Sequence, residues 1–193
     1  PKKPKKNDCV YIYSDQELNK IIAGCDNLCV GNRSKLRSAI FGTPLFVRIL
    51  ISTGLRYLEV YNLTFDDFDL KNKILRVLDV KNKKYRFIPI SFNLCKNVHR
   101  YWDFISKNAL NMNNERNLFI NLAGKRIGKD VIQKNIKKVI NKLNIINPRR
   151  LQGSRVHDFR HTFAVRFFES LILKDLNPDS YMIVLMNYLG HGS

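Results

Sequence analysis

The sequence predicts a mainly α-helical domain that carries one small antiparallel β-sheet, an α+β fold. Apolar residues recur at helical spacing in most segments between residues 14 and 190, whereas residues 74–90 alternate and are rich in β-branched side chains. The chain has 193 residues, of which 45% are hydrophobic, so it can bury a sizeable core as one domain or at most two small ones.

The charge balance indicates a polyanionic partner. The chain has 34 Lys and Arg against 16 Asp and Glu, a formal net charge of +18, and nucleic acid is the usual partner of such a chain. No apolar run approaches the ~20 residues of a membrane span, and no secretory leader is visible. The four cysteines form no Cys-x-x-Cys pair, which favours reduced structural thiols. We therefore expect an intracellular protein that contacts no membrane.

The first thirteen residues are typical of a basic linker or arm. The opening PKKPKK combines proline stiffness with four lysines and cannot pack a core. These lysines are expected near DNA phosphates, with a solvated tail as the alternative: Lys2, Lys3, Lys5 and Lys6.

Helical starts and stops are visible in the next forty residues. Ser14-Asp-Gln-Glu17 has the form of a capping box and predicts a helix with an apolar stripe. Helical spacing over residues 34–52 is interrupted by Gly-Thr-Pro at 42–44, which indicates two helices joined by a tight corner. Gly54 is predicted to cap the second helix.

Residues 74–90 predict a β-hairpin. The segments KILRVLDV and KYRFIPI flank the polar KNKK, so the tip is rich in lysine. Its turn is longer than two residues and has no glycine, which leaves the register open.

Two further helices are predicted before residue 145. One covers residues 92–106, with Trp102 on its core side. The other covers residues 130–143 and has an apolar stripe opposite four lysines. That basic face is expected to follow a phosphate backbone through Lys134 and Lys138, and a solvated face is the alternative.

The last third of the chain predicts a helical pair. A helix begins within HDFRHTF, and its core face is expected to hold Phe159, Phe163, Phe167 and Leu171. Asn177-Pro178 then starts a short helix that ends at Gly190. Before this pair, Arg149, Arg150 and Arg155 are expected to contact DNA.

The segment HDFRHTF has two interpretations. His157 and His161 stand four residues apart with an acidic residue after the first, as in the helix of zinc proteases. Alternatively, His157 and Arg160 form a His-x-x-Arg motif that binds an anion. The cationic Arg160 and the lack of a visible third ligand count against zinc, so we predict no metal site.

Four motifs in order resemble the tyrosine recombinase (phage integrase) family. STGLRYLEVYNLTFDDFDL resembles its Thr-Gly-Leu-Arg-x-x-Glu segment, HDFRHTFA its His-x-x-Arg box, and YLGHGS its Leu-Gly-His box. YRFIPI resembles the second strand of the family's hairpin. The resemblance covers residues 52–193 and implies a tyrosine recombinase catalytic-domain-like fold.

The resemblance also implies catalytic roles. Arg56 and Arg160 would clamp the phosphate, since guanidinium groups meet its charge with paired donors. Lys81 at the end of the first hairpin strand would protonate the leaving group, although Lys83 and Lys84 lie within reach and are otherwise expected to contact DNA. His157 and His191 would assist by hydrogen bonding or proton transfer. Glu59 would brace the site, and His161 would be structural.

The family's nucleophile is a tyrosine two or three helical turns after the Leu-Gly-His box, and the sequence stops at Ser193. We therefore expect residues 14–193 to be a catalytic domain truncated before the nucleophile, inactive in cleavage. Residues 1–13 would follow a missing N-terminal DNA-binding domain.

The full-length protein is expected to be a site-specific DNA recombinase or integrase that acts through a 3′-phosphotyrosyl intermediate. It would work as a homo-tetramer on double-stranded DNA sites, without a cofactor. We expect it to be cytoplasmic and associated with the nucleoid, and to be encoded by a bacterium, a phage or another mobile element. Two alternatives remain: a type IB topoisomerase-like relaxing enzyme, and a non-catalytic DNA-binding or architectural protein with the same fold.

Overall fold

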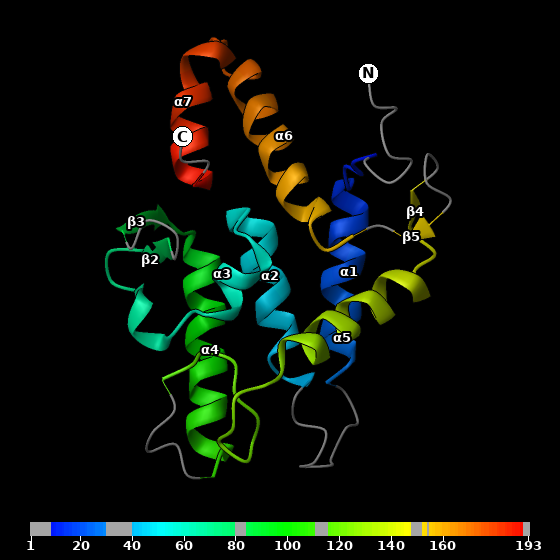
Figure 1. The fold of residues 1–193 in the computed structure, drawn as a ribbon, viewed down its shortest axis with the longest axis vertical. Helices are drawn as coiled ribbons and strands as arrows, with labels where there is room; N and C mark the ends of the chain where they lie inside the picture. Colours follow the sequence, from blue (N-terminus) through cyan, green and yellow to red (C-terminus); the bar gives the residue numbers. More distant parts are fainter. Residues whose placement is uncertain are drawn as a thin grey trace, which may run out of the picture.

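The computed structural model describes residues 9–29, 40–79, 84–110, 116–147, 152–153 and 155–190. It is mostly helical with small antiparallel sheets, which confirms the α+β prediction (Figure 1). The helices are α1 (Asp15–Asn27), α2 (Thr43–Thr53), α3 (Tyr57–Tyr61), α4 (Phe92–Asn108), α5 (Lys129–Lys142), α6 (Asp158–Ile172), α7 (Pro178–Leu189) and the 3-10 turn η2 (Phe65–Asp67). The strands are β1 (Phe68–Asp69), β2 (Ile74–Asp79), β3 (Lys84–Pro89), β4 (Ile146–Asn147) and β5 (Gln152–Gly153).

The predicted helix boundaries are largely confirmed. Ser14 caps α1 through a capping box, in which its backbone N–H donates to Glu17 Oε2 at 2.8 Å. Gly54 and Gly190 end α2 and α7 in the left-handed conformation, with φ of 62° and 70°. The first of the two helices expected between 34 and 52 would cover residues 34–41, and residues 34–39 lie outside the described residues.

The hairpin prediction is confirmed by the antiparallel pairing of β2 with β3. Ile74 pairs with Pro89 and Asp79 with Lys84, and the tip at residues 80–83 lies outside the described part. The two-residue β1 extends this sheet beyond β2. A second pair, β4 with β5, lies on the other side of the molecule and was not predicted (Figure 1).

Helix α2 is the centre of the core. It contacts α1, α4, α5 and α6, and Phe46, Val47 and Ile49 are fully buried. Its apolar surface is covered on several sides, as expected of a helix with hydrophobic residues all round. The C-terminus of α2 therefore holds the turn at Gly54 in a fixed position.

Helices α4 and α5 bury their predicted stripes with one exception. On α5 the buried residues are Ile132, Ile136, Val139 and Ile140, as predicted. On α4, Tyr101 and Ile105 face the core. Trp102, which was expected there, is 37% exposed and packs on Phe65 at the rim, with ring centroids 3.6 Å apart.

Helices α6 and α7 form a hairpin that stands at one end of the molecule (Figure 1). Phe159 and Leu171 are buried as predicted, but Phe163 and Phe167 between them are only half-buried. Phe163 instead stacks on Tyr188 of α7, with ring centroids 5.5 Å apart. None of the described helices is long and apolar enough to cross a bilayer.

The segment before α1 is pinned to α6. The Tyr13 ring stacks on Phe159 at 4.8 Å, and its backbone N–H donates to Thr162 Oγ1 at 3.0 Å. Arg166, two turns along α6 from Phe159, forms an ion pair with Asp15 at 2.6 Å. The N-terminal end of the described chain thus braces the first two turns of α6.

Candidate active site

Arg56 lies in the turn between α2 and α3, at the N-cap position of α3. Glu59 reaches back over one turn: its Oε2 accepts from the Arg56 backbone N–H at 2.8 Å, and its Oε1 accepts from Arg56 Nη1 at 3.1 Å. Arg56 and Glu59, the Arg and the Glu of the Thr-Gly-Leu-Arg-x-x-Glu segment, therefore form one hydrogen-bonded unit.

Arg160 lies in the first turn of α6 and is 4% exposed. Its Nη1 donates to Gly54 O at 3.1 Å, and its Nη2 donates to Leu189 O at 2.8 Å. Both carbonyls belong to helix C-termini, where the last carbonyls lack intrahelical partners and the helix dipole is negative. The ends of α2 and α7 thus hold a buried guanidinium in place.

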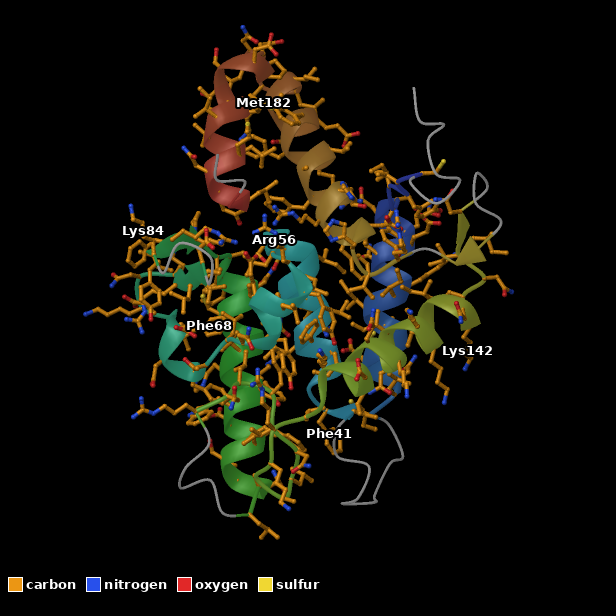
Figure 2. The ribbon with its side chains drawn as sticks, in the orientation of Figure 1. Phe41, Arg56, Phe68, Lys84, Lys142 and Met182 are labelled. Atoms are coloured by element: carbon orange, nitrogen blue, oxygen red, sulfur yellow. The ribbon has the colours of Figure 1, made fainter. Side chains whose placement is uncertain are left out.

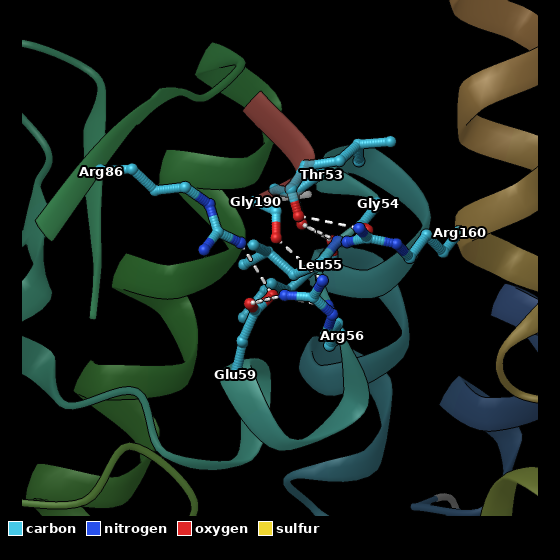
Figure 3. Close-up of polar contacts among 10 residues, drawn as sticks. Thr53, Gly54, Leu55, Arg56, Glu59, Arg86, Arg160 and Gly190 are labelled. Carbon is cyan, nitrogen blue, oxygen red and sulfur yellow. Dashed lines mark hydrogen bonds and ion pairs between the residues drawn. The ribbon is translucent and has the colours of Figure 1, made fainter. Parts of the chain in front are cut away.

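Arg56 meets Arg160 at the end of α7. Arg56 Nη2 donates to Gly190 O at 2.9 Å, the carbonyl that follows the one bound by Arg160. Figure 3 shows Arg160 reaching in from α6 toward the Gly54–Arg56 turn, with Gly190 close by. The fold therefore brings together three motifs that lie about 100 and 30 residues apart along the sequence.

The cluster has an excess of positive charge. Burial and the charge of Arg56 lower the pKa of Arg160 to about 10, so it stays protonated at neutral pH. Three arginines, Arg56, Arg86 and Arg160, gather around the single carboxylate of Glu59. The side chain of Arg56 is 41% exposed, so an anion in solution can reach it. The geometry suits an anion that gains charge during a reaction.

Two histidines flank Arg160 on α6. His157 is the N-cap residue, and its ring lies 4.9 Å from that of His161 in an edge-on arrangement. The pKa of each imidazole lies below its usual value, chiefly because each ring is partly removed from water; for His157 the neighbouring His161 and Arg160 add to the effect. Both rings are therefore neutral at pH 7 and able to donate or accept a proton.

The acidic residue of HDFRHTF serves the helix start. Asp158 is fully buried, accepts from the Arg155 backbone N–H at 2.7 Å, and lies 3.8 Å from the Arg155 side-chain Nε. A metal-protease carboxylate would instead face bound water beside the imidazoles. Across the described ranges, no group of three or more His, Cys, Asp or Glu side chains is placed to hold a metal. The geometry favours the anion interpretation of the segment.

Several predicted residues lie outside the described residues and stay predictions: Lys2, Lys3, Lys5, Lys6, Lys81, Lys83, Arg149, Arg150 and His191. Of the expected DNA contacts, Lys84, Lys134 and Lys138 are described and exposed, and Arg155 is half-buried. Figure 2 shows Lys84 at the hairpin edge of the molecule and Arg56 at the foot of the α6–α7 hairpin.

Arg86 on β3 is a site residue that the sequence analysis missed. Its Nη2 donates to Glu59 Oε2 at 2.8 Å, so Glu59 lies between two arginines (Figure 3). The signal was its phase: Arg86 is two residues before the fully buried Ile88, on the same face of the strand. An arginine in phase with core positions is unusual unless it is paired.

A cleft of about 740 Å³ opens between α3 and the β2–β3 hairpin, with Arg56 and Glu59 in its wall. Its other charged lining residues carry both signs: Arg76 and Arg116, with Asp66, Asp67 and Asp79. The cleft as a whole therefore has no excess of positive charge, in contrast to the cluster of Arg56, Arg86 and Arg160.

Comparison with known proteins identifies the family of this chain. The model of the phage integrase family matches residues 12–180, and the chain belongs to this family. It is 27% identical to tyrosine recombinase XerH of Campylobacter jejuni over 93% of this chain and 45% of that protein. The prediction drawn from the four motifs is confirmed at the level of family.

Solved structures confirm the fold. The structure of XerH site-specific recombinase bound to difH substrate has a TM-score of 0.70 and 21% identity, covering 94% of this chain and 47% of that one. The catalytic domain of bacteriophage HP1 integrase has a TM-score of 0.58 and 22% identity, covering 96% of this chain and 83% of that one. The chain spans about half the length of the curated relatives it matches.

Proposed function

We propose that the intact protein is a site-specific DNA recombinase or integrase that cuts and rejoins strands through a 3′-phosphotyrosyl intermediate. The observation that carries this proposal is the meeting of Arg56 and Arg160 at adjacent carbonyls of α7, with Glu59 beside them. Membership of the phage integrase family supports it.

The two arginines supply the electrostatic part of the reaction. As a tyrosine oxygen attacks phosphorus, negative charge grows on the non-bridging oxygens, and preorganised guanidinium donors stabilise it. Arg160 is buried and fixed at two carbonyls, whereas Arg56 is exposed on one side. Arg160 would form the rigid wall of the phosphate site and Arg56 its open edge.

Proton transfer falls to the remaining motif residues. As the P–O5′ bond breaks, Lys81 would give its proton to the 5′ oxygen, and His157 with His191 would serve the attacking oxygen and the phosphate. The 5′-hydroxyl of a second strand would then attack the phosphotyrosine, restoring both the DNA backbone and the tyrosine. Energy stays in the covalent bond, so the scheme needs no nucleotide cofactor.

We place the nucleophile outside the described residues. Tyr188 directly precedes Leu189, the acceptor of Arg160. Its ring stacks on Phe163, and burial raises the pKa of its phenol. A nucleophilic tyrosine must lose its proton readily and face the phosphate. A tyrosine in a segment following the Leu-Gly-His box is the candidate.

Double-stranded DNA is the proposed partner. The related XerH was solved on its difH substrate, and the net charge of +18 favours a polyanion here. Exposed Lys84, Lys134 and Lys138 are proposed phosphate contacts. The working unit would be a homo-tetramer across two DNA sites.

The test uses the intact native protein and nicked duplexes tiled across the DNA that flanks its gene. A nick near the cut site lets the short fragment that carries the freed 5′-hydroxyl diffuse away. The covalent intermediate then cannot be religated and is trapped. We expect a protein–DNA adduct that disappears in Arg160→Ala and persists in Arg100→Ala, an exposed arginine of α4 outside the cleft.

Other outcomes identify the alternatives. Relaxation of supercoiled DNA without exchange of partners would indicate a type IB topoisomerase-like activity. Tight DNA binding without an adduct on any duplex would indicate an architectural protein and overturn the proposal.

A further inference from the structure

Arg86 contacts both groups that hold the side chain of Arg56. Arg56 is anchored at Glu59 through Nη1 and at Gly190 O through Nη2, at 3.1 and 2.9 Å. Arg86 donates to Glu59 at 2.8 Å. It also packs on Gly190 so closely that a Cβ there would lie 2.9 Å from its Nη1 and 3.1 Å from its Cζ. Any residue other than glycine at position 190 would have to displace Arg86.

The charges explain why a second arginine is needed. The side chain of Glu59 is 10% exposed, and a carboxylate so far removed from water requires a counter-charge. If Arg56 alone balanced it, the attraction of Arg56 to Glu59 would compete with its attraction to a phosphate. Arg86 balances the carboxylate, so that the positive charge of Arg56 remains available to the substrate.

Arg86 itself is enclosed. It extends from β3 opposite Val77, which is 1% exposed, and its own side chain is 14% exposed. Within the described part of the chain, Nε and Nη1 of Arg86 are shielded from solvent and have no hydrogen-bond partner. Two unmet donors cost stability, which is hard to explain by folding alone.

We propose that Arg86 is a positioning residue for DNA strand cleavage: it fixes Glu59 and the end of α7, and through them orients Arg56 toward the scissile phosphate. The inference rests on the proposed recombinase function. Because Arg86 is shielded, it acts through Arg56 and does not touch the DNA. It also connects the β2–β3 hairpin to Arg56 and, through the end of α7, to Arg160.

The test measures single-turnover cleavage of saturating nicked substrate by the intact protein, and measures DNA affinity separately. We expect Arg86→Gln to lower the cleavage rate about 100-fold, the scale of a small misplacement of a reacting group. The Kd for DNA should stay within about threefold, since the interaction lost acts in the transition state. Arg86→Lys should restore about tenfold, because an ammonium balances Glu59 but cannot pack flat on Gly190.

The matched control is Arg100→Gln on α4. Arg100 is an exposed arginine that does not line the cleft beside Arg56 and Glu59. We expect its cleavage rate to equal that of the wild type. A similar loss in this control would mean that the loss of any exposed arginine is harmful, and would overturn a specific role for Arg86.

A double-mutant cycle separates positioning from general loosening. Once Glu59→Gln has removed the carboxylate charge, Arg86 has nothing to balance, so Arg86→Gln should cost little more in that background. If the double variant loses cleavage rate by the product of the two single losses, the proposal is overturned even if every variant is folded. Equal cleavage by Arg86→Gln and wild type would also overturn it, and would leave recombination intact. A wild type that forms no adduct would refute both the recombinase function and this inference.

Discussion

The burial of Arg160 determines how a substitution at this single residue acts. Arg160→Lys keeps the charge but cannot reach both Gly54 O and Leu189 O in one plane. We expect the free energy of unfolding to fall by about 1–3 kcal/mol, the cost of an unmet buried acceptor. Covalent adduct formation by the intact protein should fall at least about 100-fold. Urea unfolding and the nicked-duplex assay measure the two effects.

Arg166→Lys is the control on the same helix. Its ion-pair partner Asp15 is 84% exposed and Arg166 itself is 34% exposed, so water screens the pair and the change should cost less than about 1 kcal/mol. If Arg160→Lys lowers the free energy of unfolding by no more than Arg166→Lys does, the burial of Arg160 and its contacts with the two carbonyls are contradicted.

The histidine pair predicts a pH response. Because the pKa of His157 is lowered in the folded protein, the unfolded chain binds that proton more tightly. The stability due to the neutral ring is present above the ordinary value of 6.5 and is lost as the pH falls through the lowered pKa. NMR titration of the imidazole should show a pKa below 6.5. His161→Gln should move it upward, because the positive charge that His161 gains as the pH falls is removed.

At the scale of elements, the N-terminal segment should stabilise α6. Thr162→Val keeps the shape of a side chain that is 1% exposed but leaves the Tyr13 N–H without its acceptor. We expect a loss of about 1–3 kcal/mol in urea unfolding. Ser170→Ala, whose hydroxyl donates only to Phe167 of its own helix, should stay within about 0.5 kcal/mol. Equal effects would mean that Tyr13 does not brace α6.

The same elements show what could be predicted from sequence. Local signals sufficed where the cause is local: the Ser14 box, the cap at Gly54 and the stripe of α5. Periodicity identifies the face of a helix that turns inward, but the amount of neighbouring surface decides burial. Phe163 is half-buried because α6 projects with α7 beyond the core, and Trp102 lies at a rim. Two-residue strands such as β4 have no period to detect.

The candidate site was predictable only through motif resemblance. Arg56 and Arg160 lie about 100 residues apart, and no spacing rule links them; the fold joins them through the carbonyls of α7. Arg86 lies within YRFIPI, the segment that resembles the family's hairpin strand, but that resemblance assigned it no role. Its role follows from a register that pairs it with the buried Val77, and the sequence left that register open.

For the whole molecule, the net charge of +18 predicts salt-dependent DNA binding. If Lys134 and Lys138 contact phosphates, replacing both with alanine should weaken binding on every sequence. The slope of log affinity against log salt should become less steep by about two. Fluorescence anisotropy at several salt concentrations measures the slope.

The control pair is Lys96 and Lys107, exposed lysines of α4 for which no DNA contact is proposed. The same double substitution there should leave the slope unchanged. Equal changes for both pairs would show that total charge, and not the face of α5, sets the affinity.

The two α7 carbonyls also limit how the chain can vary in length over evolution. One residue inserted within α7 would rotate everything after it by about 100° and turn the acceptors of Arg56 and Arg160 away from them. An insertion in the turn at 173–177 can loop outward and leave the helix end in register. Lineages of this chain can therefore change the length of that turn, whereas α7 can exchange residues but cannot gain or lose one.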